Sequence, residues 1–269
     1  MIKKVQSIEQ VEKVFYTGDE PLLIHCTDLE FYVSKYNSTA GTANLLFREF
    51  MSASFLKLWN LQVPDFAIVN LQPHHIPANG RYINNAMPCF GSMYNNEYRE
   101  IDAFINEVSP AQRQRFNNTF DLLKITLFDY WVSNEDRNHN NYNLMLKMVD
   151  KSYQFVPIDG GAVFHSGNQN RENYTLSIEE TLISSPLFEN LIVPVTSFNA
   201  EIIANLKEIY YFCVQSCKSQ LQNIINDVPE EWQINKPAEV QNLDVFLFNP
   251  NWIEECWATF LEHLYNPGI

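Results

Sequence analysis

The chain has 269 residues, of which 46% are hydrophobic and 14% aromatic, and this composition excludes a disordered protein and permits a large buried core. Its formal net charge of −14 opposes unspecific binding to nucleic acid or to an anionic membrane, because both need a basic surface. No apolar run approaches the roughly 18 residues that a membrane-spanning helix requires.

The N-terminus and the cysteines predict the compartment. The first residues, MIKKVQSIEQVEKVF, are amphipathic and lack the continuous apolar core of a signal peptide. The five cysteines show no metal-ligand spacing, and Cys213 and Cys217 fall four residues apart on an expected helix, where buried thiols are the simpler interpretation. We therefore expect a reduced, cytoplasmic protein.

The first part of the chain alternates as β-strands do. We expect strands over residues 11–16, 21–26 and 31–36, separated by polar turns. In the third strand, FYVSKY, alternation places Lys35 on the same face as Phe31. Such a lysine is either an edge residue whose stem packs while its head reaches water, or a functional cation.

An amphipathic helix is expected next. In ANLLFREFMSASFLKLWN the apolar residues recur at helical spacing. Glu49 lies beside the apolar side of this helix. It is either an exposed residue, paired with Lys57 or with nothing, or the partner of Lys35. A strand over residues 65–71 follows. The segment 86–92, AMPCFGS, is expected to cross between two lobes, where its backbone would meet an adenine ring.

The second part of the chain is expected to be mainly helical. We expect a helix over 97–108, a new helix beginning at Ser109-Pro110 that carries a core stripe to Trp131, and a long polar segment over 165–186. Two closing helices are expected over 200–228 and 252–265. Four of their apolar residues are expected in the core: Phe212, Trp257, Phe260 and Leu264.

The stretch DYWVSNEDRNHNNYNLMLKMVDKSYQFVPIDGGAVF concentrates acidic side chains around an expected hairpin with strands at 144–146 and 155–158. Asp136 and Asn141 precede the hairpin, and Asp159 follows it in a Gly-Gly turn. Kinase sites use an Asp that faces the acceptor hydroxyl, an Asn five positions later and a second Asp, the last two as metal ligands. For the first pair alone, an ordinary Asn- and Asp-rich turn is the favoured explanation. The strand lysine and helix glutamate upstream favour the kinase.

Taken together, these residues resemble the HipA-like kinases, relatives of the protein-kinase and phosphoinositide-kinase superfamily. The matching parts are YVSKY, LFREF, LQVPDFAIV, CFGS, NEDRNHNNYNLML and VPIDGGAVF. The resemblance implies an α+β, bilobal, protein-kinase-like fold in a single domain over 1–269. A small β-rich N-lobe with one long helix would cover about 1–92, and a larger helical C-lobe about 93–269. It also implies Mg-ATP-dependent transfer of the γ-phosphoryl group to a serine or threonine hydroxyl of a protein.

The resemblance also implies a role for each site residue. The implied catalytic residues are Asp136, Lys35, Glu49 and Arg137, the magnesium ligands are Asn141 and Asp159, and the nucleotide contacts are Lys35, Thr17, Gly18, Met87, Phe90 and Gly91. Lys35, held by Glu49, would position the α- and β-phosphates. Asp136 would accept or orient the acceptor hydroxyl, and Arg137 would brace the loop.

Two departures from the family pattern leave alternatives open. No G-x-G-x-x-G loop is present, and only Thr17-Gly18 falls where a first hairpin would cover phosphates. A nucleotide-binding pseudokinase that serves as an interaction module is therefore one alternative. The D-R-x-x-x-N loop also occurs in phosphoinositide kinases, so a lipid or small-molecule kinase is another, although the acidic surface disfavours a membrane. We expect the extra N-terminal module of longer HipA toxins to be missing, so a toxin–antitoxin partner bound to DNA is not supported.

Overall fold

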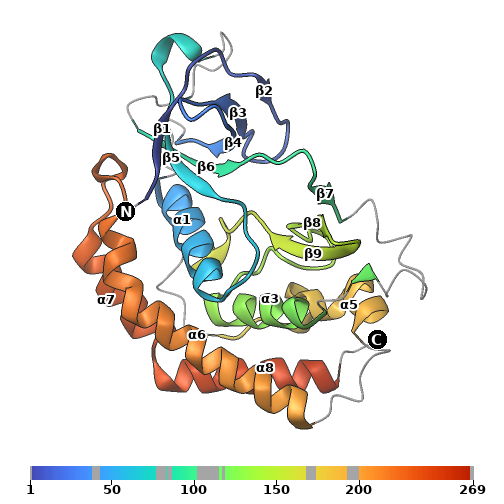
Figure 1. Cartoon of the computed structure of the whole chain (residues 1–269). Coiled ribbons are helices and arrows are strands. Elements are labelled where there is room, and N and C mark those ends of the chain that lie inside the picture. Colours follow the sequence, from blue (N-terminus) through green and yellow to red (C-terminus); the bar gives the residue numbers. More distant parts are fainter. Residues whose placement is uncertain are drawn as a thin grey trace.

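The protein consists of a smaller β-rich part with one long helix and a larger, mainly helical part (Figure 1). The structure, a computed structural model, describes residues 2–37, 43–76, 83, 87–101, 115–116, 119–167, 174–192 and 200–266. This architecture is the α+β, bilobal arrangement that the sequence predicts. Within the described residues, no helix combines the length and apolar character needed to cross a membrane.

A six-stranded sheet forms the first part, in the order β1-β5-β6-β4-β3-β2. Its strands are β1 (Lys4–Gln6), β2 (Lys13–Val14), β3 (Leu22–His25), β4 (Phe31–Lys35), β5 (Phe66–Asn70) and β6 (Cys89–Met93). Strand β1 runs parallel to β5, and the other neighbours are antiparallel. In β4 the predicted alternation holds: Tyr32 and Ser34 are fully buried, whereas Lys35 lies on the opposite, half-buried face.

Helix α1 (Ala43–Leu58) lies between this sheet and the helices of the second part (Figure 1). It matches the predicted helix, but it is covered on more than one side, because no side chain from Leu46 to Leu56 is exposed. The short helix η6 (Glu230–Trp232), from the second part, packs against it. The indole Nε1 of Trp232 donates to the carbonyl of Pro88 at 2.7 Å, and its ring packs edge-on against Phe50. The C-terminal region thus anchors α1 and the strand that follows Pro88.

The second part is organised around helix α3 (Thr119–Val132), in which every residue from Leu122 to Val132 is buried. A helix that is buried on all sides belongs in the centre of a core. The surrounding elements are β7 (Arg99–Glu100), β8 (Leu144–Val149), β9 (Ser152–Pro157), α4 (Val163–Ser166), η3 (Ile178–Glu180), η4 (Leu182–Ser184), α5 (Pro186–Leu191), α6 (Ala200–Asn226), α7 (Lys236–Leu247) and α8 (Pro250–Tyr265). One further short helix, η1 (Pro73–His75), belongs to the first part. The predicted hairpin is confirmed as β8–β9, paired from Leu144–Pro157 to Val149–Ser152.

The interpretation of residues 86–92 as the crossing between lobes is wrong. Residues Cys89–Met93 form β6, which pairs with both β5 and β4 inside the sheet. The apolar and small residues suit a strand that is covered on both faces. A Cβ at Gly91 would lie 2.6 Å from Cγ2 of Val69, so the sheet requires glycine there. The chain passes to the second part after Met93.

Two helical predictions also need correction. Residues 99–100 of the helix expected over 97–108 form strand β7, which pairs with β8, while 102–110, including Ser109-Pro110, lie outside the described residues. Phe212, expected in the core, is 70% exposed, whereas Trp257, Phe260 and Leu264 are buried. The expected helices over 200–228 and 252–265 are confirmed as α6 and α8, but α7 and β1 were not expected. All five cysteines are buried, free thiols.

Candidate active site

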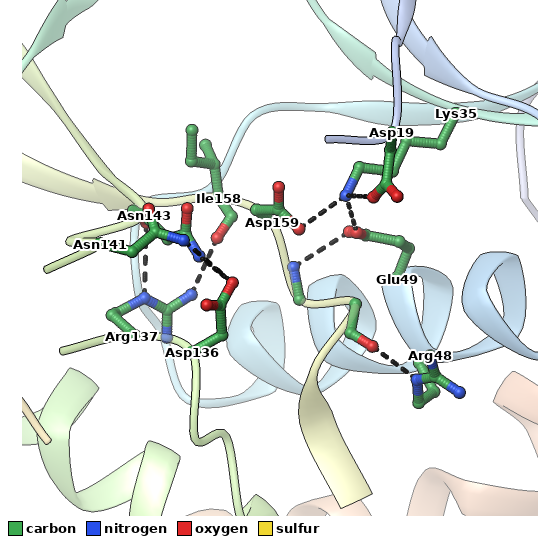
Figure 2. A network of polar contacts seen from close by, with 12 residues as sticks. Asp19, Lys35, Arg48, Glu49, Asp136, Arg137, Asn141, Asn143, Ile158 and Asp159 are labelled. Carbon is green, nitrogen blue, oxygen red and sulfur yellow. Dashed lines mark hydrogen bonds and ion pairs between the residues drawn. The ribbon is translucent and has the colours of Figure 1, made fainter. Parts of the chain in front are cut away.

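Three elements meet at the ammonium group of Lys35 at the end of β4. Its Nζ donates to Oε1 of Glu49 on α1 at 2.6 Å and to Oδ1 of Asp159 at 2.6 Å (Figure 2). Glu49 is buried, and the lysine side chain is only 12% exposed. The alternative pairing of Glu49 with Lys57 is wrong, because Lys57 bonds Asp65 at 3.0 Å. The pairing of strand lysine and helix glutamate that the kinase pattern requires is therefore present.

The three charged groups of this cluster shift one another's pKa values. Burial lowers the pKa of Lys35, but Glu49 and Asp159 outweigh it and raise the pKa above its ordinary value. Burial raises the pKa of Glu49 to about 7, and the like charge of Asp159 opposes the effect of Lys35. Burial also tends to raise the pKa of Asp159, yet Lys35 holds that pKa below its usual value. Lys35 thus keeps Asp159 ionised, which is the form that a metal ion binds.

A third carboxylate reaches Lys35 from the turn between β2 and β3. Oδ2 of Asp19 lies 3.1 Å from the lysine Nζ, and the Asp19 side chain is 46% exposed. Thr17 and Gly18 are exposed in the same turn, and a Cβ at Gly18 would meet no atom within 4 Å. The turn predicted to cover phosphates therefore lies over Lys35, and one ammonium group faces three carboxylates there.

The Gly160-Gly161 turn is packed directly against α1. The amide of Gly160 donates to Oε2 of Glu49 at 3.0 Å, and Nε of Arg48 donates to the carbonyl of Gly161 at 2.5 Å. A Cβ at Gly160 would lie 2.2 Å from Oγ of Ser52. Only glycine allows this approach, so α1 and the turn after Asp159 are in close contact.

Asp136 lies in the loop before β8 and is held by two amides. Nδ2 of Asn141 donates to its Oδ2 at 3.0 Å, and Nδ2 of Asn143 donates to the same oxygen at 3.1 Å (Figure 2). The other oxygen, Oδ1, receives neither bond. In Figure 2 Asp159 lies between this group and the Lys35 cluster. The structure thus brings together all six residues predicted as catalytic or metal-binding.

Arg137 is fully buried beneath this loop. Its Nη2 donates to the carbonyl of Ile158 at 2.9 Å, its Nε donates to the carbonyl of Asn143 at 3.4 Å, and its Nη1 bonds the carboxylate of Asp129. Burial raises the pKa of Asp129 to about 6, although Arg137 acts in the opposite direction. At neutral pH the pair is therefore ionised. Arg137 thus bonds two backbone carbonyls and a buried carboxylate, as a bracing residue would.

The donor set fits magnesium bound together with phosphates. Asn141 uses its amide nitrogen on Asp136, which leaves its carbonyl oxygen as a ligand, and Asp159 supplies a carboxylate. Mg²⁺ takes oxygen ligands and is commonly bound by one or two carboxylates plus substrate phosphates. Across the described ranges, no group of three or more His, Cys, Asp or Glu side chains is placed to hold a metal ion. The ion would thus depend on the nucleotide for much of its coordination.

Of the three residues predicted to contact adenine, two lie within strand β6 and one precedes it. Phe90 is paired with Lys35 across β4 and β6, so the two side chains share one face of the sheet. Gly91 lies in the middle of β6, where an added Cβ would meet Cγ2 of Val69 at 2.6 Å. Met87 precedes the strand, and its Sδ accepts a hydrogen bond from the Asn37 side chain. Contact of these three residues with a nucleotide stays a prediction.

Four residues of the site were not singled out from the sequence. Asp19 adjoins the Thr-Gly turn and Arg48 adjoins Glu49, but neither position carries a spacing signal. Asn143 lies in the Asn-rich loop NEDRNHNNYN, two residues after Asn141, and it could have been predicted from this position. Asp129 begins the acidic stretch, yet only the fold reveals that it faces Arg137.

Comparison with known proteins assigns the family. The sequence matches the family model for a HipA-like kinase over residues 8–258. The chain belongs to the HipA-like kinase family. No curated protein matches the sequence of this HipA-like kinase.

Two solved structures are similar to this HipA-like kinase. The crystal structure of the Helicobacter pylori proinflammatory kinase CtkA matches with a TM-score of 0.56 and 13% sequence identity, covering 96% of this chain and 98% of CtkA. HipA from Shewanella oneidensis MR-1, solved with HipB and operator DNA, has a TM-score of 0.46 and 13% identity, covering 91% of this chain and 64% of HipA. At this identity the match to CtkA shows the fold alone.

Proposed function

We propose that this HipA-like kinase transfers the γ-phosphoryl group of Mg-ATP to a serine or threonine hydroxyl of a protein. The observation that carries the proposal is the position of Asp159, which is bonded to Lys35 and follows the hairpin whose preceding loop carries Asp136. Phosphoryl transfer depends mainly on positioning and on electrostatic stabilisation, and this arrangement supplies both.

Each side chain has a distinct part in the proposed reaction. Lys35 binds the α- and β-phosphates, and Glu49 orients its ammonium group. Asn141 and Asp159 would hold magnesium, which would neutralise charge on the phosphates. Asp136 accepts the proton of the acceptor hydroxyl while that oxygen bonds to the γ-phosphorus and the bond to the β-phosphate oxygen breaks.

The test is a thermal-shift titration with Mg-ATP on the wild type and on Asp159→Asn in parallel. Ligand at about a hundred times its dissociation constant stabilises a fold by roughly 2.7 kcal/mol. We expect a magnesium-dependent shift in the wild type that Asp159→Asn weakens. Radiolabelled γ-phosphate transfer to serine- and threonine-containing proteins, and to lipids and small alcohols, then identifies the acceptor class.

A nucleotide-binding pseudokinase is the second candidate, and one observation favours it. Asp19 closes over Lys35 from the same side as the exposed Thr-Gly turn, where it opposes entry of phosphates. Binding of Mg-ATP without transfer to any acceptor, and without hydrolysis, would favour this candidate. No shift in the wild type at millimolar Mg-ATP would contradict both.

A further inference from the structure

Asp129 holds a buried carboxylate beneath the loop that carries Asp136. It lies in the last turn of α3 and is 1% exposed. Its Oδ1 accepts hydrogen bonds from Nη1 of Arg137 and, at 2.9 Å, from Nδ2 of Asn134, and its main-chain carbonyl accepts the amide of Asn134 at 2.9 Å. The end of the core helix is thus joined to the start of the loop by both backbone and side chain.

Arg137 links Asp129 to two further segments of the site. Its bond to the carbonyl of Ile158 fixes the residue immediately before Asp159. Its bond to the carbonyl of Asn143 fixes the residue whose side chain donates to Asp136. The proposed base and one proposed metal ligand therefore rest on the same guanidinium group.

Stability is a poor explanation for this arrangement. Removing two charges from water costs about as much as their attraction returns, so well-packed apolar residues often stabilise a core equally well. A buried arginine that donates three hydrogen bonds instead fixes the relative positions of its acceptors, because its planar guanidinium group donates only along defined directions.

We propose that Asp129 is a positioning residue for phosphoryl transfer, which acts by fixing the guanidinium group of Arg137 under the loops of Asp136 and Asp159. The inference rests on the proposed function, and it adds a residue that touches neither nucleotide nor acceptor.

The experiment compares Asp129→Asn, Arg137→Gln, the double variant, and Asp121→Asn as a matched control. Asp121 lies on the same helix, but its carboxylate faces Lys124 at 3.4 Å. The double variant leaves no buried charge without a partner, so it keeps the test valid if Asp129→Asn alone does not fold. We measure melting temperature, kcat and KM for ATP, and hydrogen exchange over residues 134–143 and 158–161.

We expect kcat of the double variant to fall about ten- to a hundredfold, as small misplacements of reacting groups do. KM for ATP should change less than about threefold, because Lys35 still holds Asp159 directly. The effects of the two single variants on kcat should not add in the double variant, since both remove the same bond between Asp129 and Arg137. Hydrogen exchange over both segments should accelerate, whereas Asp121→Asn should match the wild type in kcat and in exchange.

A lower melting temperature with unchanged kcat per folded molecule would overturn the inference, as would unchanged hydrogen exchange over both segments in a folded double variant. Hydrogen exchange requires no transfer. If the wild type transfers nothing, the proposed function fails, while faster exchange over the two segments still supports the placement of the loops by Asp129.

Discussion

The ammonium group of Lys35 and Oδ1 of Asp159 lie 2.6 Å apart, although 124 residues separate them in the chain. This bond joins the β-rich part to the hairpin of the second part at the proposed phosphate site. Glu49 completes the contact, because it bonds both Lys35 and the amide of Gly160. The site therefore exists only when α1 packs against the Gly-Gly turn.

Asp136→Ala should lower kcat by about two to four orders of magnitude, as loss of a general base does. The Mg-ATP thermal shift should persist, because Lys35 and Asp159 are untouched. Asp150→Asn, at the exposed tip of the hairpin, is the control. Phosphoryl transfer to a verified acceptor measures the effect, and near-wild-type transfer by Asp136→Ala would show that the role is wrong.

Asp19→Asn should tighten ATP binding. Asp19 bonds Lys35 where phosphates are proposed to bind, so its negative charge competes with theirs. An ion pair with a partly exposed partner contributes up to about 1 kcal/mol, which corresponds to a decrease in Kd of up to about fivefold. Titration at low and high salt measures the change, which should shrink as salt screens it.

Glu20→Gln is the matched control for Asp19, because Glu20 is the exposed neighbouring carboxylate in the same turn. It should leave Kd unchanged. Weaker ATP binding by Asp19→Asn would instead mean that the carboxylate assists the nucleotide.

Gly160→Ala should separate the turn from α1. The added Cβ would lie 2.2 Å from Oγ of Ser52 and 2.3 Å from its Cβ, so the free energy of unfolding should fall by about 1–3 kcal/mol. Mg-ATP binding should weaken with it, since Glu49 loses the Gly160 amide. Thermal unfolding and ATP titration measure the two effects.

The double variant Gly160→Ala/Ser52→Gly should recover ATP binding, because it removes both clashing atoms. It should retain a cost of about 1 kcal/mol for glycine within a helix. If Gly160→Ala alone melts and binds as the wild type does, the close packing of this turn on α1 is not required.

The stability contributed by Asp129 should depend on pH. Burial raises its folded-state pKa from 3.8 to about 6, so the folded state binds the proton more tightly than the unfolded chain. Its contribution to the free energy of unfolding therefore increases as pH falls from about 6 to 3.8. Arg137 is the charged group bonded to it among the described residues. Between about pH 7 and pH 5, the wild type should gain about 1 kcal/mol relative to Asp129→Asn. Denaturant unfolding at both pH values measures this difference, and a difference independent of pH would contradict the shifted pKa.

Much of the site could be predicted from sequence because each signal is local. Alternation within one strand put Lys35 on the face opposite Tyr32, helical spacing put Glu49 near the packed side of α1, and the hairpin placed Asp136 and Asp159 on either side of it. The order of these signals along the chain indicated the family, and the family model confirms it.

Tertiary structure decided what covers each face and which distant groups meet. Periodicity marked Phe212 and Trp257 alike as apolar positions on helices, yet only Trp257 is buried, because neighbouring helices cover one and leave the other in solvent. Residues 89–93 form a central strand rather than a crossing because β4 and β5 flank them. Asp19 meets Lys35, and Asp129 meets Arg137, through contacts between separate elements. The sequence by itself determined which functional side chains each helix or strand carries, because their spacing involves residues only a few positions apart. Only the packing of the elements decided which residues these side chains contact, because burial and charge pairing depend on elements far apart in the chain.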